Sequence, residues 1–262
     1  MKFDMHCHTK EGSLDGKVPV FEYIRILKEH GFDGMVVSDH NSYNGYRKWK
    51  KSAKGKENQG FVVLKGIEYD TIDAGHILVI MPETLKLRIL EMRGLPVAML
   101  IDIVHRYGGI LGPTHPCGER YLSFINTRKR RNKEEVMERF DFVETFNACE
   151  SEESNAAAAM LANKYHKPGF GGSDSHKEDC IGTAYTEFPM KIEKESDLIR
   201  CVKYGEGITC GGVYYKGTTK QKIGAWNHVL VQSFWVYNKV TGLVRKPKRK
   251  RELMKDDLKE MR

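Results

Sequence analysis

Several features that define other classes of protein are missing from this 262-residue chain. It has no apolar run of the roughly 18–20 residues that a membrane-spanning helix needs. Its first residues also lack the basic start and apolar stretch of a secretory signal peptide. We therefore expect a cytoplasmic protein with no membrane partner.

Motifs for nucleotide cofactors and for cysteine-based sites are missing too. None of the six cysteines forms a C-x-x-C pair, so reduced thiols are expected. The phosphate-binding loop G-x-x-x-x-G-K-[ST] does not occur, and the glycine-rich residues 169–172 lack the spacing of a dinucleotide-binding turn. These absences exclude the common nucleotide-cofactor sites.

Positive charge is present, but most of it lies at one end. The net charge is +8, and residues 245–262 hold nine Lys or Arg against four Asp or Glu. This basic tail is interpreted either as an arm that binds nucleic acid electrostatically or as an inert segment. Residues 118–133 are a second basic stretch, interpreted as an inserted loop.

Short apolar runs alternate with amphipathic stretches, a pattern typical of an α/β fold with a mainly parallel sheet. Strands are expected over residues 2–8, 34–40, 61–67, 76–81, 110–112, 142–146, 169–173 and 182–188, with a short segment near 207–214. Helices are expected over residues 19–30, 42–56, 95–107, 133–140, 152–165, 195–204 and 219–238.

Nine possible metal ligands lie at or near the ends of the predicted strands. They are His6, His8, Asp15, His40, Glu68, His76, His115, Asp174 and His176. Residues two apart in a strand face the same side, so His6 and His8 should face together, and so should Asp174 and His176. Cys7 should then face a helix. Imidazoles with carboxylates favour Zn, Mn or Fe, so the pattern predicts a polynuclear metal site and metal-assisted phosphoester hydrolysis.

These motifs resemble those of the PHP (polymerase and histidinol phosphatase) domain family. The matching segments are Asp4-Met5-His6-Cys7-His8-Thr9, Ser38-Asp39-His40-Asn41, Gly66-Ile67-Glu68, Gly75-His76-Ile77-Leu78, Thr114-His115-Pro116 and Gly172-Ser173-Asp174-Ser175-His176. The resemblance runs from residue 3 to about 188, and the segment from 181 onward is similar to the accessory region that follows some PHP domains. We expect a PHP domain over 1–188, an accessory region over 189–244 and the basic tail over 245–262.

The resemblance implies a distorted seven-stranded (β/α) TIM-like barrel with a C-terminal accessory helical segment. It also implies three ligand groups at one face: His6, His8, Glu68 and Asp174; Glu68, His76 and His115; and Asp15, His40 and His176. The residues expected to serve catalysis most directly are His6, His8, Glu68, His115, Asp174 and His176. Family members hydrolyse phosphate esters of histidinol, nucleotides, oligonucleotides or DNA 3′ ends.

Other polar residues are candidates for supporting roles. Asp39 is interpreted as a group that orients ligands or caps a helix, with a direct metal ligand as the alternative. Glu144 ends a strand and is interpreted as a group that orients a ligand, with a structural or solvated role as the alternative. The residues predicted to contact phosphate are Lys10, Arg120, Arg128 and Arg130. A solvated loop is the alternative for the arginines.

The leading hypothesis is a phosphoesterase that acts on nucleotides or short oligonucleotides through metal-activated water. The first alternative is a phosphatase for a small metabolite such as histidinol phosphate. The second is a non-catalytic module that keeps its metals for structure and binds nucleic acid or a protein. The sequence leaves open the metal, the exact ester and the oligomeric state.

Overall fold

The computed structural model describes residues 1–52, 60–118, 122–127, 132–217 and 233. The chain divides into a first unit, Met1–Tyr215, and a second, Lys216–Arg262. Nearly all of the second unit lies outside the described residues, and so do the predicted helix 219–238 and the basic tail. The domain boundaries at 188 and 244 stay predictions. Among the described residues, no helix combines the length and apolar character needed to cross a membrane.

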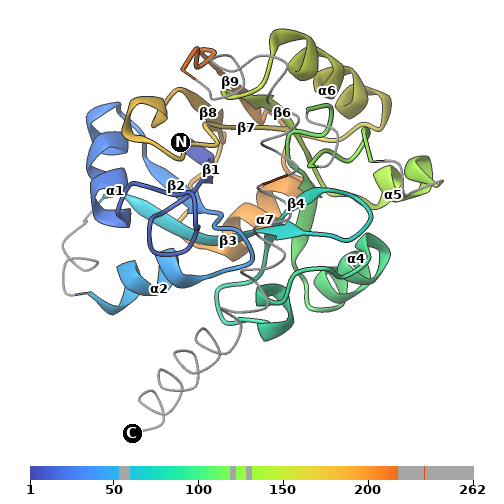
Figure 1. The fold of residues 1–262 in the computed structure, drawn as a ribbon, viewed down its shortest axis with the longest axis horizontal. Coiled ribbons are helices and arrows are strands. Elements are labelled where there is room, and N and C mark those ends of the chain that lie inside the picture. The colour runs from blue at the N-terminus through green and yellow to red at the C-terminus, as the bar shows by residue number, and fades with distance from the viewer. Residues whose placement is uncertain (53–59, 119–121, 128–131, 218–232, 234–262) are drawn as a thin grey trace, which may run out of the picture. The chain divides into compact units, whose positions relative to one another are not determined.

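The first unit has an α/β fold built on a curled seven-stranded sheet (Figure 1). The sheet order is β5 (Ile110–Pro113), β4 (His76–Ile80), β3 (Val62–Asp70), β2 (Gly34–Val37), β1 (Lys2–Cys7), β8 (Ala184–Glu187) and β9 (Thr209–Gly212). A separate parallel pair joins β6 (Val143–Asn147) to β7 (Gly169–Gly172).

Backbone hydrogen bonds beside the β6–β7 pair connect it to two strands of the curled sheet, β5 and β1. Asp141 N donates a hydrogen bond to Leu111 O of β5, and Asp174 N donates one to His6 O of β1. The resemblance implied a seven-stranded barrel. In the structure, β1 to β5 form a curled sheet that β8 and β9 extend beyond β1, and β6 and β7 form the separate pair.

The sheet is mixed, which corrects the prediction of a mainly parallel one. β1–β2 and β2–β3 are parallel, whereas β3–β4, β4–β5, β1–β8 and β8–β9 are antiparallel. The segment between β3 and β4 has no helix and closes with Thr71 N donating to Gly75 O, which is too short for a parallel crossover. Gly75 has φ 70°, and a Cβ there would lie 2.3 Å from Leu122 O. This turn therefore requires glycine.

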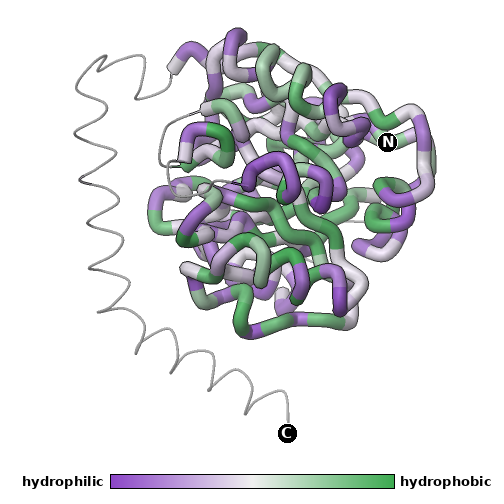
Figure 2. The backbone as a smooth tube through the Cα atoms, turned by 90° about the vertical axis from the view of Figure 1, so that its right-hand side faces the viewer, coloured by the Kyte–Doolittle hydropathy of each residue, from purple (hydrophilic) through white to green (hydrophobic). Residues whose placement is uncertain are grey.

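Six α-helices are defined among the described residues. They are α1 (Val20–Glu29), α2 (Asn44–Lys51), α4 (Val97–Arg106), α5 (Lys133–Arg139), α6 (Glu152–Lys164) and α7 (Glu195–Tyr204), with short 3-10 turns η1 (Arg88–Glu91) and η2 (Glu178–Cys180). All six fall within or close to predicted ranges, and α7 matches the prediction residue for residue. Figure 2, coloured by residue hydropathy, shows hydrophobic residues along the inner strands and hydrophilic residues over the outside.

The core explains why α1 forms where it does. Its residues Val20, Tyr23, Ile24 and Leu27 recur at helical spacing and are all buried. They pack in one cluster with Cys7, which confirms that Cys7 faces a helix and leaves the other side of β1 to its neighbouring histidines.

Candidate metal centre

The end of β1 carries the first pair of candidate ligands. His6 and His8 are both fully buried, and their Nε2 atoms lie 3.0 Å apart. Donor atoms that each lie about 2.0–2.2 Å from one ion are expected at about this spacing. The alternation predicted from the sequence is therefore present, and it aims two imidazole nitrogens at one place.

Glu68 stands at the centre of the site on β3. Its Oε1 lies 3.1 Å from both His76 Nδ1 and His115 Nε2. Its Oε2 lies 3.0 Å from His40 Nδ1 and 3.3 Å from His8 Nε2. His6 Nε2 also lies 3.4 Å from Oε1. One buried carboxylate thus faces five imidazoles through two oxygens, which is the arrangement that a residue bridging two ions needs.

The antiparallel course of β4 explains how His76 reaches the same edge. His76 is the first residue of β4 and pairs in register with Asp70, the last residue of β3. The amino end of an antiparallel strand lies beside the carboxyl end of its neighbour. A residue that begins a strand can therefore join ligands that end other strands.

Asp174 and His176 reach the site by a different route from the predicted one. β7 ends at Gly172, and Asp174 has a left-handed backbone with φ 50°. The two side chains do lie together, with Asp174 Oδ1 3.8 Å from His176 Nδ1, but strand alternation is not what aligns them. Asp174 Oδ1 nevertheless lies 3.2 Å from His8 Nε2, and His176 Nε2 lies 3.3 Å from Asp15 Oδ2.

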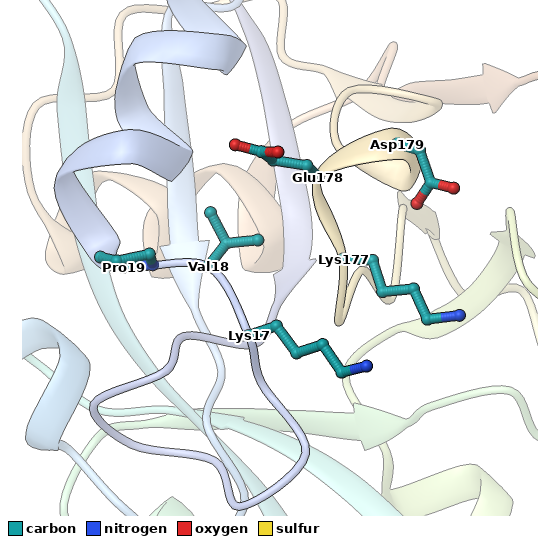
Figure 3. A pocket seen from close by; sticks show the side chains of 6 residues that line it. All are labelled: Lys17, Val18, Pro19, Lys177, Glu178 and Asp179. Atoms are coloured by element: carbon teal, nitrogen blue, oxygen red, sulfur yellow. The ribbon is translucent and has the colours of Figure 1, made fainter.

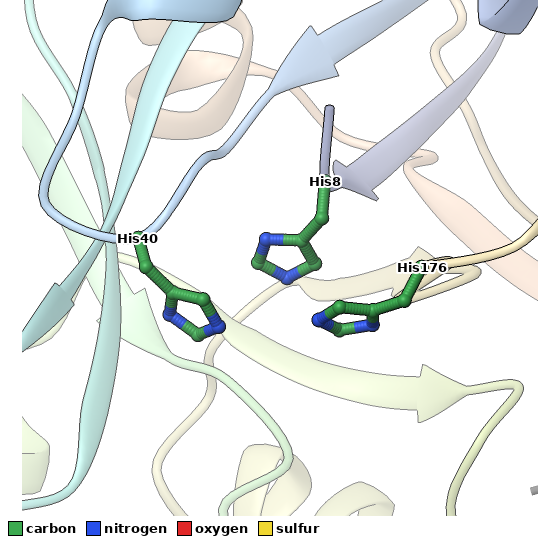
Figure 4. Close-up of side chains that lie close together, drawn as sticks. All are labelled: His8, His40 and His176. Carbon is green, nitrogen blue, oxygen red and sulfur yellow. The ribbon is translucent and has the colours of Figure 1, made fainter. Parts of the chain in front are cut away.

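Three histidines from three segments meet on the more open side of the centre (Figure 4). The ring centroids of His8 and His40 are 4.5 Å apart, and those of His8 and His176 are 4.3 Å apart. The side chains of His40 and His176 are 22% and 30% exposed, whereas His8 is fully buried. A ligand from solvent therefore reaches the centre past His40 and His176.

Several buried atoms in the centre have no hydrogen-bond partner among the described residues. They are Asp15 Oδ1, His40 Nδ1, Glu68 Oε2 and Asp70 Oδ1. Buried polar atoms normally have hydrogen-bond partners. Carboxylate oxygens and an imidazole nitrogen that face one another without such partners therefore fit a bound cation. The groups of three that could hold an ion are His6, His8 and Glu68; His8, His40 and His176; Glu68, His76 and His115; and His40, Asp70 and His76. These nitrogen and oxygen donors suit divalent transition metals or zinc.

The charges in the centre shift the pKa values of its residues in opposite directions. Burial alone would lower the pKa of His76, but Glu68 and Asp70 raise it to about 10. Asp15 outweighs burial in the same way and raises the pKa of His176 to about 9. Burial, reinforced by His176 and His40, lowers the pKa of His8 to about 3. Without metal ions, protons on His76 and His176 therefore compensate the negative charge of the buried carboxylates.

Asp39 holds a loop and contacts no candidate ligand side chain directly. Its Oδ1 accepts hydrogen bonds from Thr9 N at 2.6 Å and Ser13 Oγ at 3.0 Å, and its Oδ2 accepts one from Gly45 N at 3.2 Å. Ser13 Oγ in turn lies 3.1 Å from His8 Nδ1. Burial raises the pKa of Asp39 to about 7. Asp39 therefore shapes the segment between His8 and the start of α2.

Glu144 contacts two candidate ligands. Its Oε1 lies 2.7 Å from His6 Nδ1, and its Oε2 accepts a hydrogen bond from His115 N at 2.6 Å. An imidazole that donates one ring N–H to a carboxylate is fixed in orientation and presents its other nitrogen to a metal. Glu144 therefore lies where the predicted orienting role would need it, and the role itself stays a prediction.

Asp70 also lies in the centre, although it is not among the nine ligands predicted from the sequence. It lies two residues after Glu68 in β3 and faces the same side. The predicted strand ended at residue 67, so the alternation that was applied to His6 and His8 was not applied here. Extending the strand by three residues would have found Asp70.

Of the four residues predicted to contact phosphate, the structure describes one. Lys10 is exposed two residues beyond His8, whereas Arg120, Arg128 and Arg130 lie outside the described residues.

A pocket of about 460 Å³ lies beside the centre and is lined by Lys17, Val18, Pro19, Lys177, Glu178 and Asp179. Lys17 N donates to His176 O, and Figure 3 shows the amino groups of Lys17 and Lys177 pointing the same way. Neither lysine is among the phosphate contacts predicted from the sequence.

The sheet topology and the clustered metal-binding side chains together define a metal-dependent phosphoesterase fold. The chain belongs to the PHP domain family, since the model of the PHP domain matches residues 4–169. The model described as PHP-associated matches residues 152–206. The family predicted from the sequence motifs is thereby confirmed.

Relatives of known identity extend the comparison. The PolC-type DNA polymerase III of Lacticaseibacillus paracasei is 27% identical over 74 residues, a match that covers 28% of this chain but only 5% of the polymerase. The crystal structure of PsfC from Pseudomonas syringae has a TM-score of 0.60 at 16% identity, covering 89% of this chain and 98% of that one. Endonuclease Q, in complex with a DNA duplex that carries an abasic lesion, has a TM-score of 0.59 at 16% identity, covering 79% and 57%. These structures share the fold.

Proposed function

We propose that this chain is a metal-dependent phosphoesterase that hydrolyses phosphate esters of nucleotides or short oligonucleotides. The observation that carries the proposal is the convergence of six imidazoles on Glu68 and its neighbouring carboxylates, with buried donor atoms unpaired. Membership in the PHP family supports the same chemistry.

The residues that would hold the ions are those grouped by the family resemblance. They are His6, His8, Glu68 and Asp174 for one position, Glu68, His76 and His115 for a second, and Asp15, His40 and His176 for a third. Bound divalent ions supply a more acidic water and stabilise negative charge on phosphoryl oxygens. Zn, Mn and Fe are the candidates for the two to three ions.

The chain's own residues define where a substrate enters. His40 and His176 are the most exposed of the six imidazoles, so the phosphate is expected to approach from their side. Lys17 and Lys177 line the pocket beside His176, and Lys10 follows His8. Ammonium groups on this side would bind the anionic parts of a substrate.

A nucleotide or oligonucleotide is favoured over a small metabolite because more than one phosphate or a sugar-phosphate chain can use several lysines. Endonuclease Q, which shares the fold, was crystallised with DNA as its substrate. That likeness supports a nucleic-acid substrate for this chain as well.

The test is hydrolysis of a substrate panel by the full chain loaded with Mn²⁺. The panel contains p-nitrophenyl phosphate, bis-p-nitrophenyl phosphate, mononucleotides, a 5′-phosphorylated short RNA and histidinol phosphate. Preferred hydrolysis of the nucleotides or the RNA supports the proposal. Preference for histidinol phosphate favours the metabolite phosphatase, and no hydrolysis by protein of verified metal content favours the non-catalytic module.

A further inference from the structure

Asp70 lies between two imidazoles that belong to different ion positions. Its Oδ1 is 3.1 Å from His76 Nε2 and 3.7 Å from His40 Nδ1. Its Oδ2 is 3.1 Å from Arg93 Nη2. Only 16% of the side chain is exposed. One carboxylate oxygen therefore faces two candidate ligands, while an arginine holds the other oxygen.

The other ring nitrogen of His76 and of His40 lies near a carboxylate other than Asp70. His76 Nδ1 lies 3.1 Å from Glu68 Oε1, and His40 Nε2 lies 3.8 Å from Asp15 Oδ2. A histidine binds an ion through one ring nitrogen and carries its proton on the other. If the ions lie beside Glu68 and Asp15, the Nε2–H of His76 faces Asp70 Oδ1. The Nδ1–H of His40 lies between Glu68 Oε2 at 3.0 Å and Asp70 Oδ1 at 3.7 Å, and Asp70 is the acceptor that remains when an ion occupies Glu68.

We propose that Asp70 is a positioning residue shared by two ion positions: its Oδ1 accepts a hydrogen bond from His76 Nε2–H and, when an ion occupies Glu68, a second one from His40 Nδ1–H. This inference rests on the proposed metal centre. A carboxylate oxygen has two lone pairs, so it can accept both bonds. Asp70 Oδ1 is buried and has no hydrogen-bond partner among the described residues, so it is available for them. Arg93 fixes the carboxylate from the outer side.

The shared oxygen has a distinctive consequence. Loss of Asp70 should weaken the two outer ion positions together and leave the position of His6, His8 and Asp174 intact. Removing a carboxylate that orients a metal-bound histidine typically lowers metal affinity about 10- to 100-fold. A ligand of a single ion would weaken one position only.

The experiment is a Zn²⁺ titration of the metal-free full chain against a chelating dye, for wild type, Asp70→Asn and Arg93→Gln. For Asp70→Asn we expect one equivalent to bind as in wild type and the others to bind about 10- to 100-fold more weakly. Arg93→Gln leaves both imidazoles and the carboxylate in place, so a smaller loss of the same equivalents is expected. Asp102→Asn is the matched control, because Asp102 is an exposed carboxylate beside Arg139.

Each outcome bears on the inference separately from activity. Unchanged affinities in Asp70→Asn would overturn it while leaving the proposed function standing. Loss of a single equivalent would identify Asp70 as the ligand of one ion and would also overturn the shared role. A wild-type chain that binds no divalent ion would overturn the proposed function together with the inference. If Asp70→Asn does not fold, as judged by circular dichroism without metal, Arg93→Gln decides.

Discussion

Two buried charged residues on β3, three positions apart, are treated in opposite ways. Lys65 is fully buried, and its Nζ donates hydrogen bonds to Pro82 O at 2.8 Å and Glu83 O at 3.1 Å. Its backbone N donates to Glu195 Oε1 at 2.7 Å. Glu68 is buried just as deeply, yet its Oε2 has no hydrogen-bond partner among the described residues.

The difference separates a structural cluster from a binding site. Around Lys65 the protein itself satisfies the buried polar groups, as interiors normally do. Around Glu68 it gathers donor atoms and leaves some of them unpaired, which is unfavourable unless a cation completes the set. Substitutions in the first cluster should therefore change stability, whereas those in the second should change metal binding and activity.

The largest effect is expected from removing the first ligand pair. In His6→Ala/His8→Ala, loss of the innermost ion position should lower hydrolysis of the best substrate at least about a thousandfold, because metal stabilisation of the transition state is worth several kcal/mol. Steady-state kinetics and metal analysis of the folded variant would measure both losses. Retained activity would contradict the metal mechanism, and Asp102→Asn should behave as wild type.

The Lys65 cluster should respond in the opposite sense. Lys65→Met keeps most of the buried stem but leaves Pro82 O and Glu83 O unpaired, which should reduce the free energy of unfolding by about 2–4 kcal/mol. Denaturant unfolding would measure the loss. Zn²⁺ stoichiometry of the folded variant should be unchanged; a change would show that the two ends of β3 are coupled.

Glu144→Gln should have a smaller effect on the metal centre. The carboxylate that orients His6 becomes a neutral amide of the same shape, so metal affinity should fall about 10- to 100-fold while the fold is retained. Competition with a chelator would measure affinity for wild type and variant. If affinity does not change, the contact between Glu144 and His6 is structural only.

The smallest effect is a pH dependence that should reverse with metal. The pKa of His76 is raised to about 10, and that of His176 to about 9, from an ordinary 6.5. Proton binding by these groups stabilises the metal-free fold fully below pH 6.5, and this stabilisation is lost as the pH rises through about 9–10. The Tm of the metal-free chain should therefore fall by a few °C between pH 7 and 9.5.

Metal ions compete with these protons, so the gain in Tm on adding Zn²⁺ should grow over the same pH range up to about pH 8. His76→Gln should flatten the metal-free slope, and scanning calorimetry at several pH values would measure it. A Tm that rises with pH in the metal-free chain would contradict the assigned pKa shifts.

Much of the site could be predicted from local patterns in the chain. The alternation of His6, Cys7 and His8 follows from the two-residue period of a strand, and the structure places them as that period requires. The spacing of apolar residues likewise predicted α1 and α7. Each of these features depends only on neighbours in the sequence.

How these side chains reach one place depends instead on how distant segments meet. Whether Asp174 points into the centre is decided by its left-handed backbone, held by the bond from its N to His6 O. Whether His76 lies at that edge is decided by the antiparallel turn at Gly75.

The sequence by itself determined the family, the identities of nine candidate ligands and the faces of the regular elements, because residue type and period are local properties. Only the tertiary structure decided that Glu144 lies against His6 and that Asp39 holds a loop. Those roles arise from strand register and from contacts between residues about 30 to 140 positions apart, which no local period encodes.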